Sequence, residues 1–210
     1  MKASRILAAT AASVTPAMLL LGPVPTAAAQ SCPTTEVVFA RGTSEPPGLG
    51  KVGNAFVSAL RSRVSGSVGS YAVNYPASYD FGLAADGAND ASGHIQYMVD
   101  NCPGTRLVLG GYSQGAAIID IIAAAPVPGF GFTAPLPPES ADHVAALAVF
   151  GNPSSRIGQP LTNSPVYGPR TIDLCAGGDP ICSIGMNFGA HSSYTPGLTN
   201  QAAGFAAGLL

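Results

Sequence analysis

The sequence predicts a three-layer α/β sandwich built around a parallel β-sheet. Five short strand-like runs alternate along the chain with longer segments of helical periodicity, a pattern typical of βαβ units. Two of these runs, 106–112 and 143–150, are almost continuously apolar. Strands without a polar face are buried on both sides, as in a parallel sheet that carries helices on each face.

The expected elements follow one another without internal repeats or long linkers. Val52, Phe56, Leu60 and Val64 recur at helical spacing and predict a helix over 52–64. The five predicted strands are 36–40, 70–75, 106–112, 143–150 and 170–174. The other predicted helices are 84–101, 114–125 and 200–210, and the predicted surface loops are 129–138 and 151–169.

The first 30 residues carry the features of a secretory signal peptide in the usual order. Lys2 and Arg5 form a basic start, residues 6–21 are mostly apolar, and three alanines at 27–29 precede the expected cleavage site. The apolar stretch is too short and too interrupted for a stable membrane span of about 20 residues. We therefore predict that 1–30 is removed and that the mature protein is secreted, either extracellular or associated with the cell wall.

The remaining region, 31–210, has the size of one domain with one substantial core. Charged residues make up 10% of the chain, against about 25% in a typical soluble domain. The formal net charge is −2, and loss of Lys2 and Arg5 changes it to −4. Nucleic-acid binding needs a basic patch, so a weakly acidic chain with few Lys and Arg argues against that class of partner. We expect a monomer with no nucleic-acid partner and no stable membrane span.

Four cysteines lie in the mature region, and an even number behind a signal peptide predicts two disulfides with three possible pairings. Cys175 and Cys182 are close enough in sequence to close a small loop, which leaves Cys32 with Cys102. A zinc site is the rival interpretation. It lacks support because the chain has no C-x-x-C pair and no clustered histidines, so no metal is expected.

Residues 111–115, Gly-Tyr-Ser-Gln-Gly, match the pattern G-x-S-x-G. This pattern places the serine on a tight turn between a strand and a helix, with its hydroxyl exposed above an α/β-hydrolase sheet. Alone it is also compatible with an ordinary glycine-rich turn. Here a predicted buried strand precedes it and a predicted helix follows it, which favours Ser113 as a nucleophile.

A serine hydroxyl needs a histidine base, and in this fold the histidine follows both the serine and the acid along the chain. His94 precedes Ser113 and falls on a predicted helix. His143 begins a predicted buried strand. His191 follows every carboxylate in the chain and lies in a polar loop before the last helix. His191 is therefore the predicted base.

Five carboxylates lie between Ser113 and His191. Asp120 falls inside the helix after the serine, and Glu139 and Asp142 come before the fourth strand, too early in the topology. Asp179 follows the fifth strand, inside a loop that a Cys175–Cys182 disulfide would hold in place. Asp179 is the predicted acid. Asp173, within the fifth strand, is its best rival, and Asp179 before Pro180 is also a common turn sequence.

Acyl transfer also needs hydrogen-bond donors aimed at the developing oxyanion. One is expected from the backbone N–H of Gln114, directly after the nucleophile. The second is expected from the loop after the first strand, residues 41–45, where Thr43 offers both an N–H and a hydroxyl.

With these residues assembled, the chain resembles the cutinase family, and in particular the cutinase-like secreted esterases of mycobacteria and related actinobacteria. The resemblance spans nearly all of the mature chain, which makes it far more specific than the serine motif alone. The matching segments are 39–43 (FARGT), 75–77 (YPA), 110–115 (GGYSQG), 173–175 (DLC), 178–182 (GDPIC), and His191 with Tyr194.

The resemblance implies a small α/β-hydrolase with a central five-stranded parallel sheet and no large lid. It implies Ser113 as nucleophile, Asp179 as acid, His191 as base, and an oxyanion hole at Thr43 and Gln114. It also favours the disulfides Cys32–Cys102 and Cys175–Cys182. The fungal enzymes usually carry Ser where this chain has Thr43. Thr keeps the hydroxyl but adds a methyl group, so the resemblance supports the N–H of Thr43 as a donor more directly than its side chain.

The activity implied is hydrolysis of carboxylic esters with short or medium acyl chains, and of lipid or polyester substrates, without metal or cofactor. Apolar residues expected around the acyl chain are Leu83, Ile184, Phe188 and Leu198. One alternative keeps the triad but transfers the acyl group, as in an acyltransferase or thioesterase for cell-envelope lipids. Another is a secreted binding protein without catalysis, which the complete triad disfavours.

Overall fold

The computed structural model describes residues 32–124, 128–129 and 131–210. The predicted signal peptide, 1–30, lies outside the described residues.

Five parallel strands form one sheet in the order β2-β1-β3-β4-β5. The strands span Thr35–Ala40 (β1), Val68–Ala72 (β2), Arg106–Tyr112 (β3), Val144–Phe150 (β4) and Thr171–Leu174 (β5). In the middle of the sheet Val38 pairs with Leu109 and Leu109 with Leu147, and all three side chains are buried. The apolar runs that predicted strands covered on both faces are therefore the central strands.

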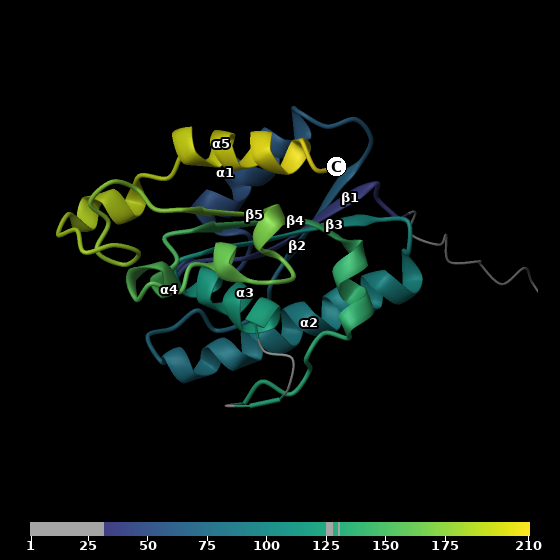
Figure 1. Ribbon diagram of the computed structural model, residues 1–210, viewed down its shortest axis with the longest axis horizontal. Coiled ribbons are helices and arrows are strands. Elements are labelled where there is room, and N and C mark those ends of the chain that lie inside the picture. The colour runs from purple at the N-terminus through teal and green to yellow at the C-terminus, as the bar shows by residue number, and fades with distance from the viewer. Residues whose placement is uncertain (1–31, 125–127, 130) are drawn as a thin grey trace, which may run out of the picture. The chain divides into compact units, whose positions relative to one another are not determined.

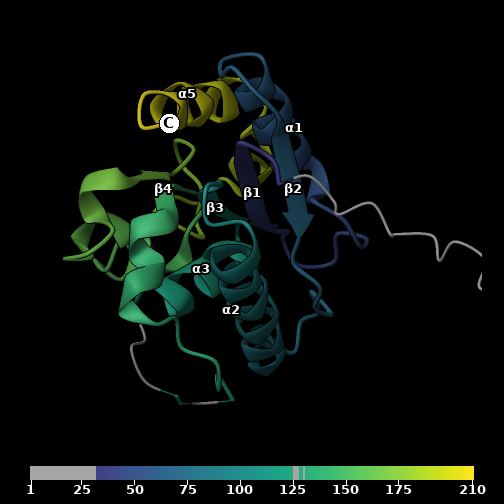
Figure 2. The ribbon, with the colours of Figure 1, turned by 90° about the vertical axis from the view of Figure 1, so that its right-hand side faces the viewer.

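Helices cover both faces of the sheet, which confirms the three-layer α/β prediction. The helices span Gly50–Arg61 (α1), Ala84–Asn101 (α2), Gln114–Ala124 (α3), Pro153–Arg156 (α4) and Gly197–Ala207 (α5). Figures 1 and 2 show α1 and α5 on one face and α2 and α3 on the other.

The core beneath α1 and α5 is aromatic. Phe39 of β1, Phe56 of α1 and Phe150 of β4 have ring centroids 5.8–6.4 Å apart. The Phe39 ring lies against Gly53 and Gly110, where a Cβ atom would come within 2.6 Å of it. Because of these short distances, glycine is needed at both positions to make room for the ring. Each of the three buried rings stabilises the fold by roughly 1.5–3 kcal/mol by leaving water.

The second predicted strand ends earlier than expected. The sheet strand β2 covers Val68–Ala72 rather than 70–75. The N–H of Val73 still donates to the carbonyl of Phe39 in β1 at 3.0 Å, but the carbonyl oxygens of Val73 and Tyr75 accept from the guanidinium of Arg41, at 3.3 and 2.6 Å. For these two carbonyls the Arg41 side chain is the partner, where a longer strand would use backbone N–H groups.

Several other element boundaries differ from the prediction by one to three residues. His143 ends a 3₁₀ turn, Pro138–His143, so β4 begins one residue later. Helix α1 ends at Arg61 rather than 64, and α5 is shifted three residues toward the N-terminus. The two predicted surface loops are also not wholly exposed, since Phe132, Leu161 and Tyr167 are buried. Periodicity does not reveal isolated apolar residues that return to the core from a loop.

Two disulfides are present, Cys32–Cys102 and Cys175–Cys182. The first ties the chain before β1 to the end of α2, and the second closes the loop after β5. In the part of the chain that the structure describes, no helix is long and apolar enough to cross a membrane. Those residues also contain no cluster of three potential metal ligands.

Candidate active site

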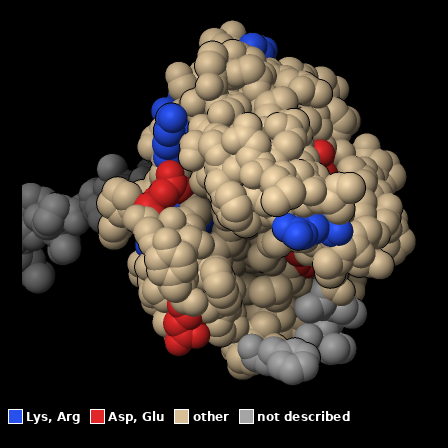
Figure 3. All heavy atoms as spheres, turned by 90° about the vertical axis from the view of Figure 1, so that its left-hand side faces the viewer, with Lys and Arg blue, Asp and Glu red and all other residues tan. Residues whose placement is uncertain are grey.

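Polar residues converge at the carboxyl edge of the sheet, where ligands bind in open α/β sheets. Ser113 follows β3, the segment 41–45 follows β1, and the segment 175–192 follows β5. Figure 3 views the molecule from this side, and most of its surface carries neither basic nor acidic side chains.

Ser113 occupies a strained turn between β3 and α3. Its φ is +56°, in the left-handed region, and its N–H donates to the carbonyl of Phe150 at 2.9 Å. A Cβ atom on Gly111 would lie 2.2 Å from Gly115 O, and one on Gly115 would lie 1.9 Å from Ala40 O. The glycines of the motif are therefore required by backbone contacts, and the strain sits at a functional position, as is common.

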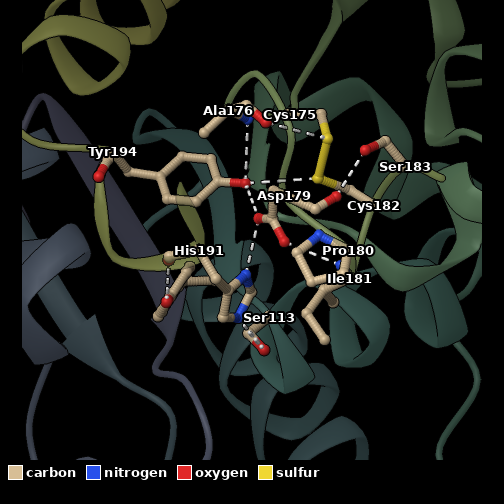
Figure 4. Close-up of polar contacts among 12 residues, drawn as sticks. Ser113, Cys175, Ala176, Asp179, Pro180, Ile181, Cys182, Ser183, His191 and Tyr194 are labelled. Atoms are coloured by element: carbon tan, nitrogen blue, oxygen red, sulfur yellow. Dashed lines mark hydrogen bonds and ion pairs between the residues drawn. A yellow bond between two sulfur atoms is a disulfide. The ribbon is translucent and has the colours of Figure 1, made fainter. Parts of the chain in front are cut away.

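The structure brings together the three residues that the sequence analysis placed in the triad (Figure 4). His191 Nε2 lies 2.9 Å from Ser113 Oγ, and His191 Nδ1 lies 2.7 Å from Asp179 Oδ2. An ionised carboxylate only accepts hydrogen bonds, so Nδ1 carries the proton and Nε2 is left to accept from the serine hydroxyl. This is the arrangement in which a histidine can take a proton from the serine.

The Asp179 carboxylate is completely buried, and each of its oxygens accepts hydrogen bonds. Oδ1 accepts from the backbone N–H of Ile181 at 2.8 Å. Oδ2 accepts from His191 and also from the hydroxyl of Tyr194, at 2.5 Å. The short loop closed by Cys175–Cys182 holds the carboxylate in this position.

The imidazole of His191 rests against an aromatic and a glycine. The ring of Tyr112 stacks on it with centroids 5.0 Å apart, and the Tyr112 hydroxyl donates to the His191 carbonyl at 2.5 Å. Gly151 has a φ of +59°, and a Cβ there would lie 2.9 Å from His191 Cε1. Only glycine therefore fits behind the imidazole.

Thr43 and Gln114 lie side by side, but their side chains bond to each other. The Thr43 hydroxyl donates to Gln114 Oε1 at 3.2 Å, and Gln114 Nε2 donates to the carbonyl of Ser78 at 3.2 Å. The Thr43 hydroxyl hydrogen, considered above as a possible oxyanion donor, is engaged in this structure. Among the described residues, neither backbone N–H of this pair has an acceptor.

A buried arginine supports the loop that carries Thr43. Arg41 is 3% exposed, and its Nε donates to the carbonyl of Glu45 at 2.8 Å. The Glu45 carboxylate accepts from the N–H of Gly42 at 2.7 Å and from the N–H of Lys51 at 2.7 Å. Sequence reasoning placed Arg41 and Glu45 in the oxyanion loop but missed the supporting role of their side chains. An arginine directly after a buried strand, in a chain with few charged residues, was the available signal.

The rival residues lie in other environments. His94 of α2 bonds to Glu36 at 2.5 Å and stacks on Tyr71. Asp173 accepts from Asn152, Ser155 and the N–H of Leu161, none of which is a triad residue.

Burial raises the pKa of both carboxyl groups near Asn152. The pKa of Asp173 is raised by desolvation, and the pKa of Asp120 is raised to about 6 by desolvation, with a further contribution from the charge of Asp173. Neither aspartate has a hydrogen bond to His191 in the structure.

Two loops, the one before α2 and the one after Asp179, each carry exposed apolar side chains. Ile184 and Phe188, both expected near the acyl chain, are 92% and 74% exposed. Leu83 is half-buried, and Leu198 packs against the core beneath α5. The other exposed members of these two loops are Tyr79, Phe81 and Met186.

A cavity of about 570 Å³ lies elsewhere, between the end of α3 and segment 159–167, and none of the triad residues lines it.

A family model and similar curated proteins point to the same family. The family model described as Cutinase matches residues 31–210. The phospholipase Culp4 of Mycobacterium tuberculosis is 60% identical over 208 residues, covering 98% of this chain and 92% of that protein. The carboxylesterase Culp1 of Mycobacterium bovis is 52% identical over 192 residues, covering 87% of this chain and 84% of that protein.

Solved structures agree with the fold. The catalytic core domain of acetyl xylan esterase from Trichoderma reesei has a TM-score of 0.74 and 26% identity, covering 86% of this chain and all of that chain. A Trichoderma reesei cutinase bound to a phosphonate inhibitor has a TM-score of 0.70 and 29% identity, covering 85% of this chain and 77% of that chain. The chain therefore belongs to the cutinase family, a family of carboxylic ester hydrolases.

Proposed function

We propose that this protein is a secreted serine esterase that cleaves carboxylic esters through an acyl-enzyme, with Ser113 as nucleophile, His191 as base and Asp179 as acid. The observation that carries the proposal is the continuous chain of contacts from Ser113 Oγ through His191 to Asp179 Oδ2, at 2.9 and 2.7 Å.

In the proposed mechanism His191 Nε2 takes the hydroxyl proton while Ser113 Oγ attacks the ester carbonyl carbon. The imidazolium then gives this proton to the leaving alcohol as the C–O bond breaks, which produces the acyl-enzyme. Water attacks the acyl-enzyme with His191 again as base, and the carboxylic acid leaves. Asp179 stays ionised throughout, and it orients the imidazole and stabilises its positive charge.

The oxyanion that forms at the carbonyl is assigned to the backbone N–H groups of Thr43 and Gln114. Both follow carboxyl ends of neighbouring strands, and both lack acceptors among the described residues. Donors fixed in place before the reaction cost no reorganisation when charge develops. The Thr43 hydroxyl has an indirect part in this proposal, because it holds the Gln114 side chain.

The proposed substrates are esters with an apolar acyl group, including lipids. The two loops that carry Phe81, Ile184, Met186 and Phe188 present apolar side chains to solvent near the site. Large exposed apolar side chains in one region are typical of a surface that binds apolar partners. The names of the relatives, a phospholipase and a carboxylesterase, support the same substrate class.

Export is part of the proposal. The basic, apolar and small-residue order of the N-terminus supports it, as do the two disulfides, since disulfides persist in oxidising compartments.

The test is hydrolysis of p-nitrophenyl esters from acetate to palmitate by the oxidised protein, with wild type beside Ser113→Ala. We expect turnover by wild type and a loss of at least about a thousand-fold in the variant, because the nucleophile is absent. Including an alcohol as acyl acceptor shows whether the acyl group goes to water or to the alcohol. A folded wild-type protein that is inactive on every ester would overturn the proposal.

A further inference from the structure

We infer that Tyr194 is a positioning residue for Asp179, with a hydroxyl that fixes the carboxylate and shares its negative charge with His191. The inference rests on the proposed function, because it assigns a role within the same triad. The motif that includes Tyr194 marked a family resemblance only, and the roles proposed above do not use it.

The direction of the Tyr194–Asp179 hydrogen bond follows from its partners. The Tyr194 oxygen accepts a hydrogen bond from the backbone N–H of Ala176 at 3.2 Å and lies 2.5 Å from Asp179 Oδ2. A carboxylate has no proton to give, so the phenol donates to Oδ2. Burial raises the pKa of Tyr194 well above its usual value, which keeps the phenol protonated wherever the enzyme works.

The phenol ring is held from several sides. Tyr194 is fully buried and meets the ring of Phe150 edge-on at 6.1 Å. A Cβ atom on Gly151 would lie 3.0 Å from the Tyr194 hydroxyl, and Cys182 Sγ lies 3.4 Å from the same oxygen. Figure 4 shows the ring reaching between the Cys175–Cys182 loop and His191 toward Asp179. A hydroxyl confined in this way fixes the carboxylate that it bonds to.

The same carboxylate oxygen accepts from both Tyr194 and His191, and this gives the hydroxyl an electrostatic effect. A donor on Oδ2 takes up part of the negative charge that would otherwise stabilise the imidazolium. Removing it leaves a carboxylate with more charge for His191. His191 would then hold its second proton to higher pH, where it cannot act as a base.

The other charged and titratable groups that contact the triad or its neighbours, among the described residues, lie on different elements. Tyr112 of β3 contacts His191 through its ring and hydroxyl. Arg156 of α4 donates to the carbonyl of Pro180, next to Asp179. Glu45, in the loop after β1, raises the pKa of Tyr112 by its charge, after the larger effect of burial. None of these groups donates to Asp179, so Tyr194 can be varied without altering another donor to the carboxylate.

Tyr112 provides a matched control within the chain. Its hydroxyl also makes a 2.5 Å hydrogen bond at the triad, but to the backbone carbonyl of His191 rather than to the carboxylate. Tyr112→Phe therefore removes a hydroxyl that positions His191, keeps the stacked ring, and leaves the donors to Asp179 unchanged. Tyr194→Phe removes the donor to Asp179.

The experiment measures kcat and KM for p-nitrophenyl butyrate from pH 5 to 9 in wild type, Tyr194→Phe and Tyr112→Phe, with circular dichroism to verify folding. For Tyr194→Phe we expect kcat to fall about ten-fold with KM within about two-fold, because a hydrogen bond to a charged group is lost. We also expect the acid limb of log(kcat/KM) to move up by about half a pH unit. For Tyr112→Phe we expect a lower kcat and an unmoved acid limb.

A folded Tyr194→Phe enzyme whose acid limb is unmoved, or moves to lower pH, would overturn the inference. A purely structural loosening would weaken the Asp179–His191 contact, and the imidazolium would then be less stabilised, so the acid limb would not move up. A shift of equal size in Tyr112→Phe would overturn it as well. If Tyr194→Phe does not fold, the same comparison is made with 3-fluorotyrosine at position 194 alone. The fluorinated phenol is a stronger donor to Asp179, so it should move the acid limb to lower pH. Failure of the proposed function is recognised separately, by activity that survives in Ser113→Ala.

Discussion

The side chains of Arg41 and Tyr75 each donate a hydrogen bond to the backbone carbonyl of the other residue. Arg41 Nη2 donates to the carbonyl of Tyr75 at 2.6 Å, and the Tyr75 hydroxyl donates to the carbonyl of Arg41 at 2.5 Å. The guanidinium carbon also lies 4.9 Å from the centre of the Tyr75 ring. This reciprocal pair links the loop after β1 to the chain after β2, and so fixes the segment that presents Thr43.

Removing the Tyr75 hydroxyl should therefore weaken the proposed oxyanion hole. In Tyr75→Phe we expect kcat to fall about three- to ten-fold with little change in KM, since one buried hydrogen bond is lost. Steady-state kinetics on a soluble ester measures it. Tyr167→Phe is the control, because Tyr167 is equally buried but lines the cavity at the end of α3, which neither Arg41 nor Tyr75 lines. Unchanged kcat in folded Tyr75→Phe would show that Arg41 supports the loop without it.

Thr43→Val separates the hydroxyl of Thr43 from its backbone N–H. The hydroxyl donates to Gln114 Oε1, so its loss removes a brace and leaves the proposed backbone donors in place. We expect kcat to fall less than about ten-fold, against about a hundred- to a thousand-fold when a direct oxyanion donor is lost. Single-turnover acylation rates are the measurement. A loss of a hundred-fold or more would mean that the hydroxyl itself turns to the oxyanion during the reaction.

Asp120 should make stability depend on pH. One of its oxygens accepts from Asn152 at 3.2 Å, and the other is buried without a partner among the described residues. Its pKa is raised from 3.8 to about 6, chiefly by burial, so the folded state binds the proton more tightly than the unfolded chain. The stabilisation of the folded state by proton binding to Asp120 is fully present below about pH 4 and is lost as the pH rises through 6.

Asp120→Asn keeps a neutral side chain at every pH. We expect it to increase the free energy of unfolding by roughly 2 kcal/mol at pH 7.5 and to have little effect at pH 4. Chemical denaturation at both pH values measures this, with Asp100→Asn on the exposed end of α2 as control. A variant that is less stable than wild type at pH 7.5 would contradict the prediction.

The two disulfides should differ in their effects on thermal stability and on kcat. Cys32–Cys102 spans 70 residues and Cys175–Cys182 spans 7. Chain entropy assigns about 4 kcal/mol to the long loop and about 2.5 kcal/mol to the short one. We expect Cys32→Ser/Cys102→Ser to lower the melting temperature more while retaining most of kcat at 20 °C. Cys175→Ser/Cys182→Ser should lower kcat more, because its loop holds Asp179. Equal losses of kcat in the two folded variants would contradict this.

Much of the fold could be predicted from the sequence because strand and helix periodicity are local properties. The runs at 106–112 and 143–150 are apolar on both faces, and only the centre of a parallel sheet buries both. The candidate site could be predicted as far as chain order allowed. Ser113, Asp179 and His191 lie after the carboxyl ends of strands, which a parallel sheet places at one edge, and they meet there.

Only the tertiary structure decided which polar groups meet across the chain. Tyr194 reaches Asp179, and Arg41 reaches the carbonyls after β2, through contacts between segments 15 to 34 residues apart. No periodicity marks such a partner, because a buried hydroxyl and a solvated one look alike in sequence. The sequence determined the strand order along the chain and the residues able to do the chemistry. Three-dimensional packing decided which hydrogen bond each buried donor makes, because burial leaves a polar group only the partners that surround it.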